Sequence, residues 1–331
     1  MEMVKILVEY GADVNSRDKD NYTPLYWASK LYLTYGTFEM VKYLITHGAN
    51  VNAENNDKWT PLHEAAEHGT FEMFSYLVEH GANINATTNK NDTPLSLAVQ
   101  NGKMQIVKYL VEHGADVNSR DEYNYTPLHW VYREELRLVE FLITHGAQVN
   151  AEDIDKWTPL HNAARYGKFE IFKYLIEHGA NMNATTVENE TTLFLAAGNG
   201  NMQIVKYLVE HGADVNSRTI YNQTPLYWTI RYGTYEMFKY LIEHGANIND
   251  TIVFNQTPLF LAVQNGNREI VRYLVEHGAD VNSTDNSHAT PLHMASLHGS
   301  AELVKYLINN GANVNATTVQ NITPLFYAVQ N

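Results

Sequence analysis

The 331-residue chain contains no cysteine, and its basic residues are far fewer than its acidic ones. The lack of cysteine excludes disulfide bonds, thiolate catalysis and zinc sites with cysteine ligands. With 23 lysine and arginine residues against 37 aspartate and glutamate residues, the formal net charge is −14. We therefore expect no nucleic-acid ligand and no binding to an anionic membrane surface, because both interactions depend on clustered lysine and arginine.

The sequence also lacks long apolar segments and the motifs of common active sites. No apolar run approaches the roughly 18 residues that a membrane-spanning helix needs, and the first ten residues are amphipathic and acidic, unlike a signal peptide. We expect no membrane insertion and an intracellular location, in the cytoplasm of the source cell or of a host. The patterns G-x-x-x-x-G-K-[ST], G-x-S-x-G and H-E-x-x-H, which support phosphate, acyl-transfer and zinc chemistry, are missing.

Acidic pairs and histidines are frequent, and we interpret both without invoking chemistry. Pairs such as Asp18 with Asp20 fall in expected turns, where no desolvated pocket separates their pKa values as catalysis requires. A histidine precedes the glycine that closes most repeats, and imidazoles on repeats about 10 Å apart cannot converge on one metal ion. These histidines, which we expect to cap helix C-termini, are His47, His80, His113, His145, His178, His211, His244 and His277. The sequence thus predicts no enzyme, no metal site and no cofactor.

Two short markers recur along the chain in strict alternation, which is typical of a repeat protein. Thr-Pro-Leu begins at Thr23, Thr60, Thr93, Thr126, Thr158, Thr224, Thr257, Thr290 and Thr323, and Thr191-Thr192-Leu193 fills the one gap. Gly-Ala-x-x-Asn begins at Gly11, Gly48, Gly81, Gly114, Gly146, Gly179, Gly212, Gly245, Gly278 and Gly311. The spacing of the first marker is 33 residues except for one interval of 37 and one of 32. No linker interrupts the series, so we expect one solenoid over residues 1–331.

Residues 60–85 show how one repeat is built. Thr60 suits a helix N-cap, and Pro61 follows at the first helical position, where a missing N–H costs nothing. The short first helix ends at Gly69, and a second helix with apolar residues at helical spacing ends at Gly81. Neither helix is long enough to be stable alone, so each repeat must bury its apolar side against the next repeat.

This pattern resembles the ankyrin repeat, whose 33-residue period and T-P-L-H-x-A signature it shares over essentially the whole chain. The resemblance implies an all-α solenoid of stacked helix-turn-helix units with projecting β-hairpin-like loops, and a groove that mostly binds proteins and catalyses nothing. The repeats are expected to start near residues 23, 60, 93, 126, 158, 191, 224, 257 and 290, with partial repeats at 1–22 and 323–331.

The chain departs from the family pattern at several points. The hairpin position two residues before each Thr, where the family normally has glycine, is occupied by Asn21, Asn91, Asn124, Asn189, Asn222, Asn255, Asn321, Lys58, Lys156 and His288. Asparagine tolerates positive φ well, so we expect these turns to survive, with more strain at the other three residues. Residues 29–35 include four extra residues, and residues 131–136 have one fewer and no glycine, which predicts a kink near 131–138.

Aromatic and basic residues at the expected hairpin tips and first-helix ends are the candidate partner-binding residues, because exposed tyrosine, tryptophan and arginine commonly anchor protein interfaces. They are Tyr22, Trp59, Tyr123, Tyr125, Trp157, Arg165, Tyr166, Tyr221, Arg231, Tyr232 and Phe254. Trp27, Trp130 and Trp228 are equally compatible with packing between repeats and with binding. The sequence predicts a module that binds another protein.

A second interpretation stays open, because the chain begins with a second helix and ends with a first helix. Solenoids normally carry polar capping repeats at both ends, and neither end of this sequence has one. The chain is therefore also expected to suit a structural or elastic segment of a larger protein, such as a channel, toxin or adaptor. End-to-end self-association through the uncapped terminal repeats is a further expectation.

Overall fold

The computed structural model describes residues 1–30, 37–133, 136–232 and 234–330, and within these ranges every helix belongs to a regular alternation of two kinds. The first helix of each repeat is α2 (Pro24–Lys30), α4 (Pro61–Glu67), α6 (Pro94–Gln100), η1 (Pro127–Arg133), α9 (Pro159–Tyr166), α11 (Thr192–Gly198), α13 (Pro225–Arg231), α15 (Pro258–Gln264), α17 (Pro291–Leu297) or α19 (Pro324–Val329). The second helices are α1 (Glu2–Glu9), α3 (Thr37–Thr46), α5 (Phe71–Glu79), α7 (Met104–Glu112), α8 (Leu136–Thr144), α10 (Phe169–Glu177), α12 (Met202–Glu210), α14 (Tyr235–Glu243), α16 (Arg268–Glu276) and α18 (Ala301–Asn309). A short 3₁₀ turn, η2 (Val253–Asn255), lies in one connecting loop. The prediction of an all-α repeat fold is confirmed.

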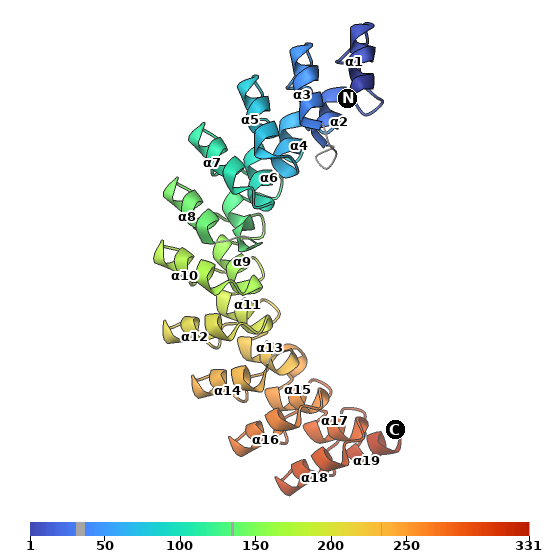
Figure 1. Ribbon diagram of the computed structural model, residues 1–331. Helices are drawn as coiled ribbons and strands as arrows, with labels where there is room; N and C mark the ends of the chain where they lie inside the picture. The colour runs from blue at the N-terminus through green and yellow to red at the C-terminus, as the bar shows by residue number, and fades with distance from the viewer. Residues whose placement is uncertain (31–36, 134–135, 233, 331) are drawn as a thin grey trace. The chain divides into compact units, whose positions relative to one another are not determined.

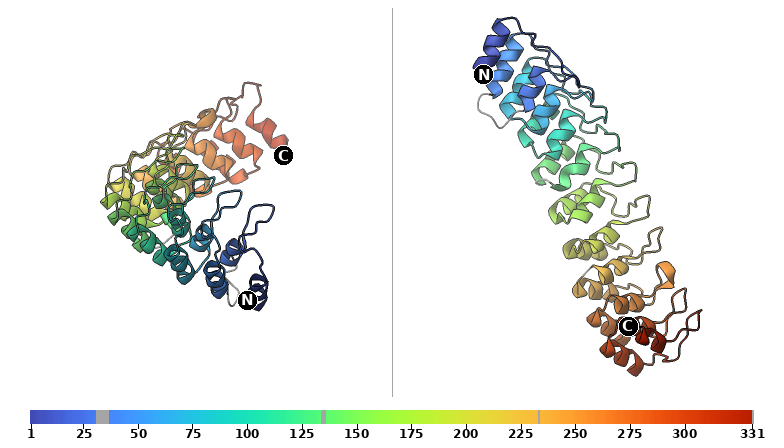
Figure 2. Two further views of the ribbon diagram at one scale, coloured as in Figure 1. Left: turned by 90° about the horizontal axis from the view of Figure 1, so that it is seen from above. Right: turned by 90° about the vertical axis from the view of Figure 1, so that its right-hand side faces the viewer.

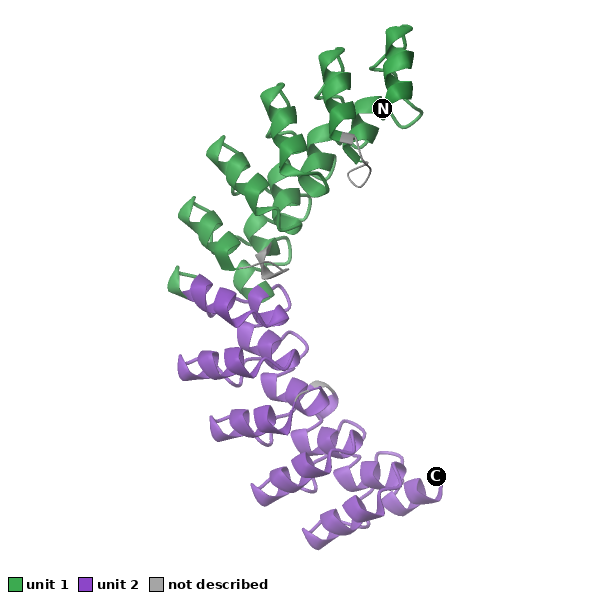
Figure 3. Cartoon of the chain, viewed as in Figure 1, with its two compact units in different colours: residues 1–162, 177–180 green, residues 163–176, 181–331 purple. Residues whose placement is uncertain are grey.

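The chain divides into two compact units, with residues 1–162 and 177–180 in unit 1 and residues 163–176 and 181–331 in unit 2 (Figure 3). In unit 1, α2, α4, α6 and η1 pack side by side in chain order, and α3, α5 and α7 form a second layer behind them (Figure 1). In unit 2, α11, α13, α15, α17 and α19 form the corresponding first layer. The expectation of one continuous domain over residues 1–331 stays a prediction.

Each first helix begins just after a repeat threonine, which is followed by proline in every repeat except that of α11, where Thr192 takes its place. The Thr60 hydroxyl accepts a hydrogen bond from the His63 backbone N–H, and Pro61 stands at the first helical position. Leu62, Ala65 and Ala66 are fully buried against neighbouring helices, where small side chains allow close packing. The helix ends at Glu67, and a Cβ on Gly69 in the following turn would lie 2.7 Å from the Ala65 carbonyl oxygen.

The second helices other than α1 and α18 end on the predicted histidine-glycine pair. The Nδ1 of His80 lies 2.8 Å from the Tyr76 carbonyl oxygen, and its ring lies over the Tyr76 ring with the centroids 3.9 Å apart. Gly81 then takes φ +89° and reverses the chain. The same Nδ1 contact with the carbonyl four residues earlier occurs at His47, His113, His145, His211, His244 and His277. The capping interpretation is confirmed at these positions, and the described residues contain no group of three or more potential metal ligands.

The loops between repeats project together from one side of each unit (Figure 2). All ten predicted tip residues have φ between 58° and 66°, including Lys58, Lys156 and His288, so the prediction that these turns survive is confirmed. The greater strain expected at those three residues stays a prediction. Adjacent tips are joined by backbone hydrogen bonds, as from Asn56 N–H to the Asp20 carbonyl and from Asn89 N–H to the Asp57 carbonyl. These bonds fix the spacing of the tip side chains along each unit.

The signature histidines connect each first helix to the next loop. His63 is fully buried; its Nδ1 accepts from the Thr60 N–H at 3.2 Å, and its Nε2–H points at the carbonyl oxygens of Ala86 and Asp92, 3.1 and 3.2 Å away. His129 and His293 make equivalent contacts to the carbonyls of Trp157 and Ile322. Burial lowers the pKa of His63 and of His129 to about 4, so both rings are neutral near pH 7.

The shortened repeat adopts a different first helix. Residues 127–133 form a 3₁₀-helix, η1, where the repeat pattern predicts an α-helix. A 3₁₀-helix rises about 2.0 Å per residue against about 1.5 Å for an α-helix, so it spans a similar length with fewer residues. Residues 134–135, within the predicted kink at 131–138, lie outside the described residues. Residues 31–36, which hold most of the four-residue insertion, also lie outside them, so neither prediction is tested.

Candidate protein-binding surface

The predicted anchor residues lie on the loops and first helices, but they fall into several groups. The exposed members are Tyr123, Arg165, Tyr166, Tyr221, Arg231, Tyr232 and Phe254, whereas Tyr22, Trp59, Tyr125 and Trp157 are half-buried. Three pockets collect five of them: one pocket is lined by Tyr22 and Trp59, a second by Tyr123 and Tyr125, and a third by Arg165. Arg231 does not line the third pocket, but it donates a hydrogen bond to Tyr232, whose ring stacks on the lining residue Trp228.

The first pocket, in unit 1, is here called the Tyr22–Trp59 pocket and has a volume of about 230 Å³. Its lining residues are Tyr22, Tyr26, Lys30, Asn55, Asp57, Trp59, Glu64, Glu67 and His68. The rings of Tyr22 and Tyr26 pack with centroids 4.5 Å apart and form one aromatic wall. The loop is held in place by Asn55, whose side-chain oxygen accepts hydrogen bonds from the N–H groups of Asp57 and Trp59.

Glu64 places a buried carboxyl group in the wall of this pocket. Its side chain is only 2% exposed, and its Oε2 accepts a hydrogen bond of 2.8 Å from the Tyr26 hydroxyl. The other carboxylate oxygen, Oε1, has no hydrogen-bond partner. The nearest group that could carry positive charge is His68, whose Nε2 lies 4.0 Å away. Burial, together with the Glu64 carboxylate, raises the pKa of the neighbouring Glu67 carboxyl.

The second pocket, also in unit 1, is here called the Tyr123–Tyr125 pocket and has a volume of about 460 Å³. It is lined by Lys90, Asp92, Gln100, Asp121, Glu122, Tyr123, Tyr125 and Trp130. The Asp121 carboxylate accepts hydrogen bonds of 2.9 Å from the N–H groups of Tyr123 and Tyr125, and the Tyr125 ring packs on Trp130 with centroids 5.2 Å apart. Two of the predicted anchors are thus positioned by one buried turn and one neighbouring helix.

The carboxylates of the Tyr123–Tyr125 pocket are crowded. Burial raises the pKa of Asp92 and of Asp121, and the negative charge of Glu122 adds to both shifts. Burial, followed by the charge of Asp153, raises the pKa of Tyr125 to about 12. Lys90 forms an ion pair of 3.6 Å with Glu122 at the rim, where both side chains are solvent-exposed. Such exposed pairs contribute little, so the pocket retains an excess of negative charge.

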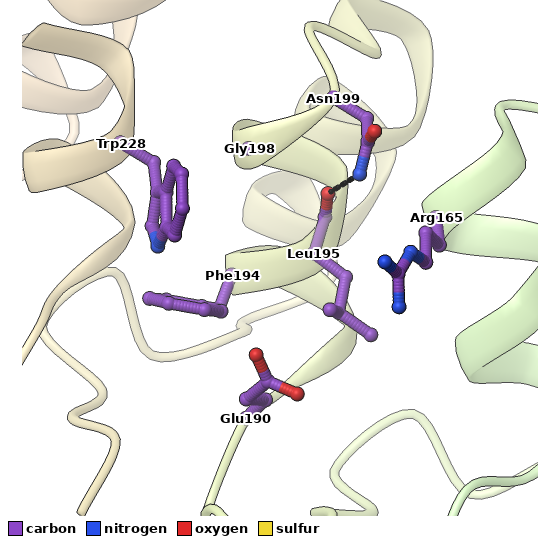
Figure 4. Close-up of a pocket in the computed structure, with 7 residues that line it drawn as sticks. All are labelled: Arg165, Glu190, Phe194, Leu195, Gly198, Asn199 and Trp228. Atoms are coloured by element: carbon purple, nitrogen blue, oxygen red, sulfur yellow. Dashed lines mark hydrogen bonds between the residues drawn. The ribbon is translucent and has the colours of Figure 1, made fainter. Parts of the chain in front are cut away.

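The third pocket, in unit 2, is here called the Trp228 pocket and has a volume of about 300 Å³ (Figure 4). The Trp228 indole lies beside Gly198 and meets the Phe194 ring edge to face at 5.8 Å. Arg165 lies across from Trp228, and Glu190 lies between them, below Phe194 in the view of Figure 4. The Trp228 indole N–H is buried without a hydrogen-bond partner. Burial, with a smaller contribution from Glu188, raises the pKa of Glu190.

The basic residue Arg231, expected to face a partner, is held by two neighbouring tyrosines. It donates hydrogen bonds of 2.8 Å to the hydroxyls of Tyr227 and Tyr232, and the Tyr232 ring stacks on Trp228 with centroids 5.0 Å apart. This cluster places a cation and two aromatic rings at the end of α13. Six of the predicted anchors do not line the three pockets described above: Trp157, Tyr166, Tyr221, Arg231, Tyr232 and Phe254.

Several residues of these pockets were not predicted from the sequence, Glu64 above all. It occupies the fourth position after the repeat threonine, a position that otherwise holds Trp27, Leu97, Trp130, Asn162, Leu195, Trp228, Leu261, Met294 and Tyr327. A carboxylate at a repeat position that otherwise holds mostly apolar or aromatic residues is the feature of the sequence that could have identified this pocket. Trp130 and Trp228 both pack on neighbouring rings and line pockets, and their role in binding stays a prediction.

The sequence model of ankyrin repeats in three copies matches the chain over residues 1–88, 86–153, 131–219, 160–252, 218–285, 248–318 and 283–331. The chain therefore belongs to the ankyrin-repeat family, whose members generally serve as protein-interaction modules and scaffolds. None of the curated proteins matches it. In the part of the chain that the structure describes, no helix combines the length and apolar character needed to cross a bilayer.

Proposed function

We propose that the chain binds a partner protein through its loop tips and first helices, here together called the tip surface. The observation that carries the proposal is the exposure of large aromatic side chains on that surface, with Tyr123 51% and Phe254 67% exposed. Exposed aromatic residues beside pockets are the typical anchors of protein interfaces. A standard interface buries about 800 Å² on each partner, which a few adjacent repeats provide.

The rigidity of the tips supports recognition of a preformed surface. The backbone hydrogen bonds between adjacent tips, the buried Asp121 turn and the Asn55 turn hold Tyr123, Tyr125 and Trp59 in place. Side chains that are already ordered lose less conformational entropy on binding. Binding at the tip surface therefore does not lose free energy to the ordering of these loops.

A paired affinity capture from lysate of the source cells tests this proposal. One bait is the natural chain, one carries Trp59→Ala and Tyr123→Ala, and a control bait carries Tyr10→Ala. Tyr10 is 89% exposed at the end of α1, outside the tip surface, so the control removes an exposed aromatic side chain from elsewhere on the chain. We expect a protein that is held by the natural and control baits and lost from the double variant. Identical capture by all three baits would exclude the tip surface as the binding site.

A second candidate function is assembly of this chain into a longer structure through its terminal repeats. The observation in its favour is the exposed apolar side chains of α1 and α19, with Met3 74% and Leu325 73% exposed. Contiguous exposed apolar side chains commonly mark surfaces that are covered by another surface. Replacing Leu7 and Leu325 by glutamate should abolish any concentration-dependent association seen by analytical ultracentrifugation, and an unchanged monomer at all concentrations would refute this candidate.

A further inference from the structure

The two pockets of unit 1 share a composition that points to one kind of ligand group. The Tyr22–Trp59 pocket has three carboxylates, Asp57, Glu64 and Glu67, against Lys30. The Tyr123–Tyr125 pocket has three others, Asp92, Asp121 and Glu122, against Lys90. Both pockets are also walled by tyrosine and tryptophan rings, which attract cations and pack on aliphatic stems.

Glu64 provides an independent observation in the first pocket. A carboxylate that is almost fully buried normally has partners for both oxygens, because an unpaired buried charge is costly. Here the Tyr26 hydroxyl serves Oε2, and Oε1 has no partner. Because Oε1 is buried, a ligand must displace a neighbouring side chain to reach it. The His68 side chain is 37% exposed, and its Nε2 lies 4.0 Å from Oε1. Oε1 can accept a hydrogen bond from a ligand, and the negative charge of the surrounding carboxylates favours a ligand group that is positively charged.

The spacing of the two pockets defines the shape of the ligand. The Tyr22–Trp59 pocket lies between the repeats that start at residues 23 and 60, and the Tyr123–Tyr125 pocket lies between those that start at 93 and 126. The pockets are therefore two repeats apart, or about 20 Å at the usual spacing of packed helices. An extended chain covers that distance with about six residues.

We propose that unit 1 binds an extended segment of its partner protein that inserts two basic side chains, about six residues apart, into these two pockets. The proposal rests on the proposed function and names the partner's chemistry: a lysine- or arginine-bearing segment with little local secondary structure. The ammonium or guanidinium group in the first pocket pairs with Glu64, and the one in the second pairs with Asp92 beside the Tyr123 and Tyr125 rings.

An array of random 15-residue peptides tests the proposal, each peptide carrying lysine at positions 5 and 11 and each synthesised a second time with both lysines acetylated. Acetylation keeps the side chain and removes its charge. Four labelled proteins are applied, each to its own copy of the array: the natural chain, Glu64→Gln, Asp92→Asn and the control Glu112→Gln. Glu112 is an exposed carboxylate at the end of α7, so the control makes the same change of charge outside the pockets.

We expect the natural chain and the control to bind a subset of lysine peptides at least tenfold more strongly than their acetylated forms, and each pocket variant to lose about tenfold, as the loss of one charge-assisted hydrogen bond predicts. Thermal unfolding shows whether each variant is folded. If Glu64→Gln is not folded, the comparison of Asp92→Asn with the natural chain tests the proposal. Peptides bound equally with and without acetylation, or equally by all variants, would overturn the basic-segment proposal and leave the proposed function standing. Binding to no peptide would also overturn it, and the capture experiment then decides the proposed function separately.

Discussion

Acid should destabilise this solenoid through its buried signature histidines, and His63 allows the effect to be isolated. In the folded chain, His63 is neutral because Nδ1 accepts from Thr60 and Nε2–H faces two carbonyl oxygens. A proton on Nδ1 would break the first contact and place a charge in a site without solvent. Burial therefore lowers its pKa to about 4, against an ordinary value of 6.5.

The sign and magnitude follow from this difference. A lowered pKa means that the unfolded chain takes up the proton first as the pH falls, so the free energy of unfolding decreases from pH 6.5 down to about pH 4. The difference of pKa corresponds to about 3 kcal/mol for His63 when complete, and to about 2 kcal/mol at pH 5. His129 should contribute a similar amount, because its pKa is lowered to about 4 by the same cause.

The measurement is urea unfolding between pH 7.5 and 4.5 for the natural chain and for His63→Phe. Phenylalanine already occupies this position in other repeats as the buried Phe194 and Phe260, so the variant should fold. Half-buried carboxyls such as Asp92 and Asp121 have raised pKa values and act with the opposite sign, so the quantity to compare is the difference in stability between the two proteins at each pH. Phe260→Leu serves as control, since it changes the same position without a titratable group.

We expect His63→Phe to lose about 2 kcal/mol less stability than the natural chain between pH 7.5 and pH 5, whatever its stability at neutral pH. Phe260→Leu should shift the whole curve without changing its dependence on pH. If His63→Phe and the natural chain lose the same free energy over this range, the buried imidazole is not the source of acid sensitivity and the reasoning is wrong.

Three further predictions concern packing and hydrogen bonding. Gly69→Ala should lower the free energy of unfolding by about 1–3 kcal/mol, because its Cβ would lie 2.7 Å from the Ala65 carbonyl oxygen; an unchanged urea midpoint would contradict this. Asn52→Ala should cost about 1–3 kcal/mol in the same assay, since it removes the bond from its amide to the Gly81 carbonyl and leaves the Asn83 N–H without its acceptor. Trp228→Phe should keep or raise the melting temperature, because the indole N–H that it removes is buried without a partner; a large decrease would show that this N–H is satisfied.

The repeat fold could be predicted from the sequence because its determinants are local and occur many times. Threonine-proline starts, histidine-glycine ends and asparagine tips each specify one backbone conformation, and the structure places them there. The 3₁₀ form of η1 was not predicted, because the missing residue could be absorbed either in the loop or in the helix. Only the packing against α6 and α8 decides between these possibilities.

The candidate site was predicted less completely, because a pocket depends on which side chains from neighbouring repeats face each other. Tyr123 and Tyr125 were predicted as anchors, but their carboxylate neighbours Asp92 and Glu122 come from two different loops. Glu64 has the sequence context of an exposed helical residue, and only its contact with Tyr26, 38 residues away, shows that it is buried. The charge of each pocket is therefore a property of the stack of repeats.

Hydrogen–deuterium exchange of the chain with and without the partner obtained by capture tests the central claim most directly. Binding at the tip surface predicts slower amide exchange in α4, in α6 and in the loops around residues 20–22, 57–59, 90–92 and 121–125. It predicts no change in the second helices α3, α5 and α7. Protection confined to those second helices, or to α1 and α19, would contradict the claim and assign recognition to the opposite face or to the terminal repeats.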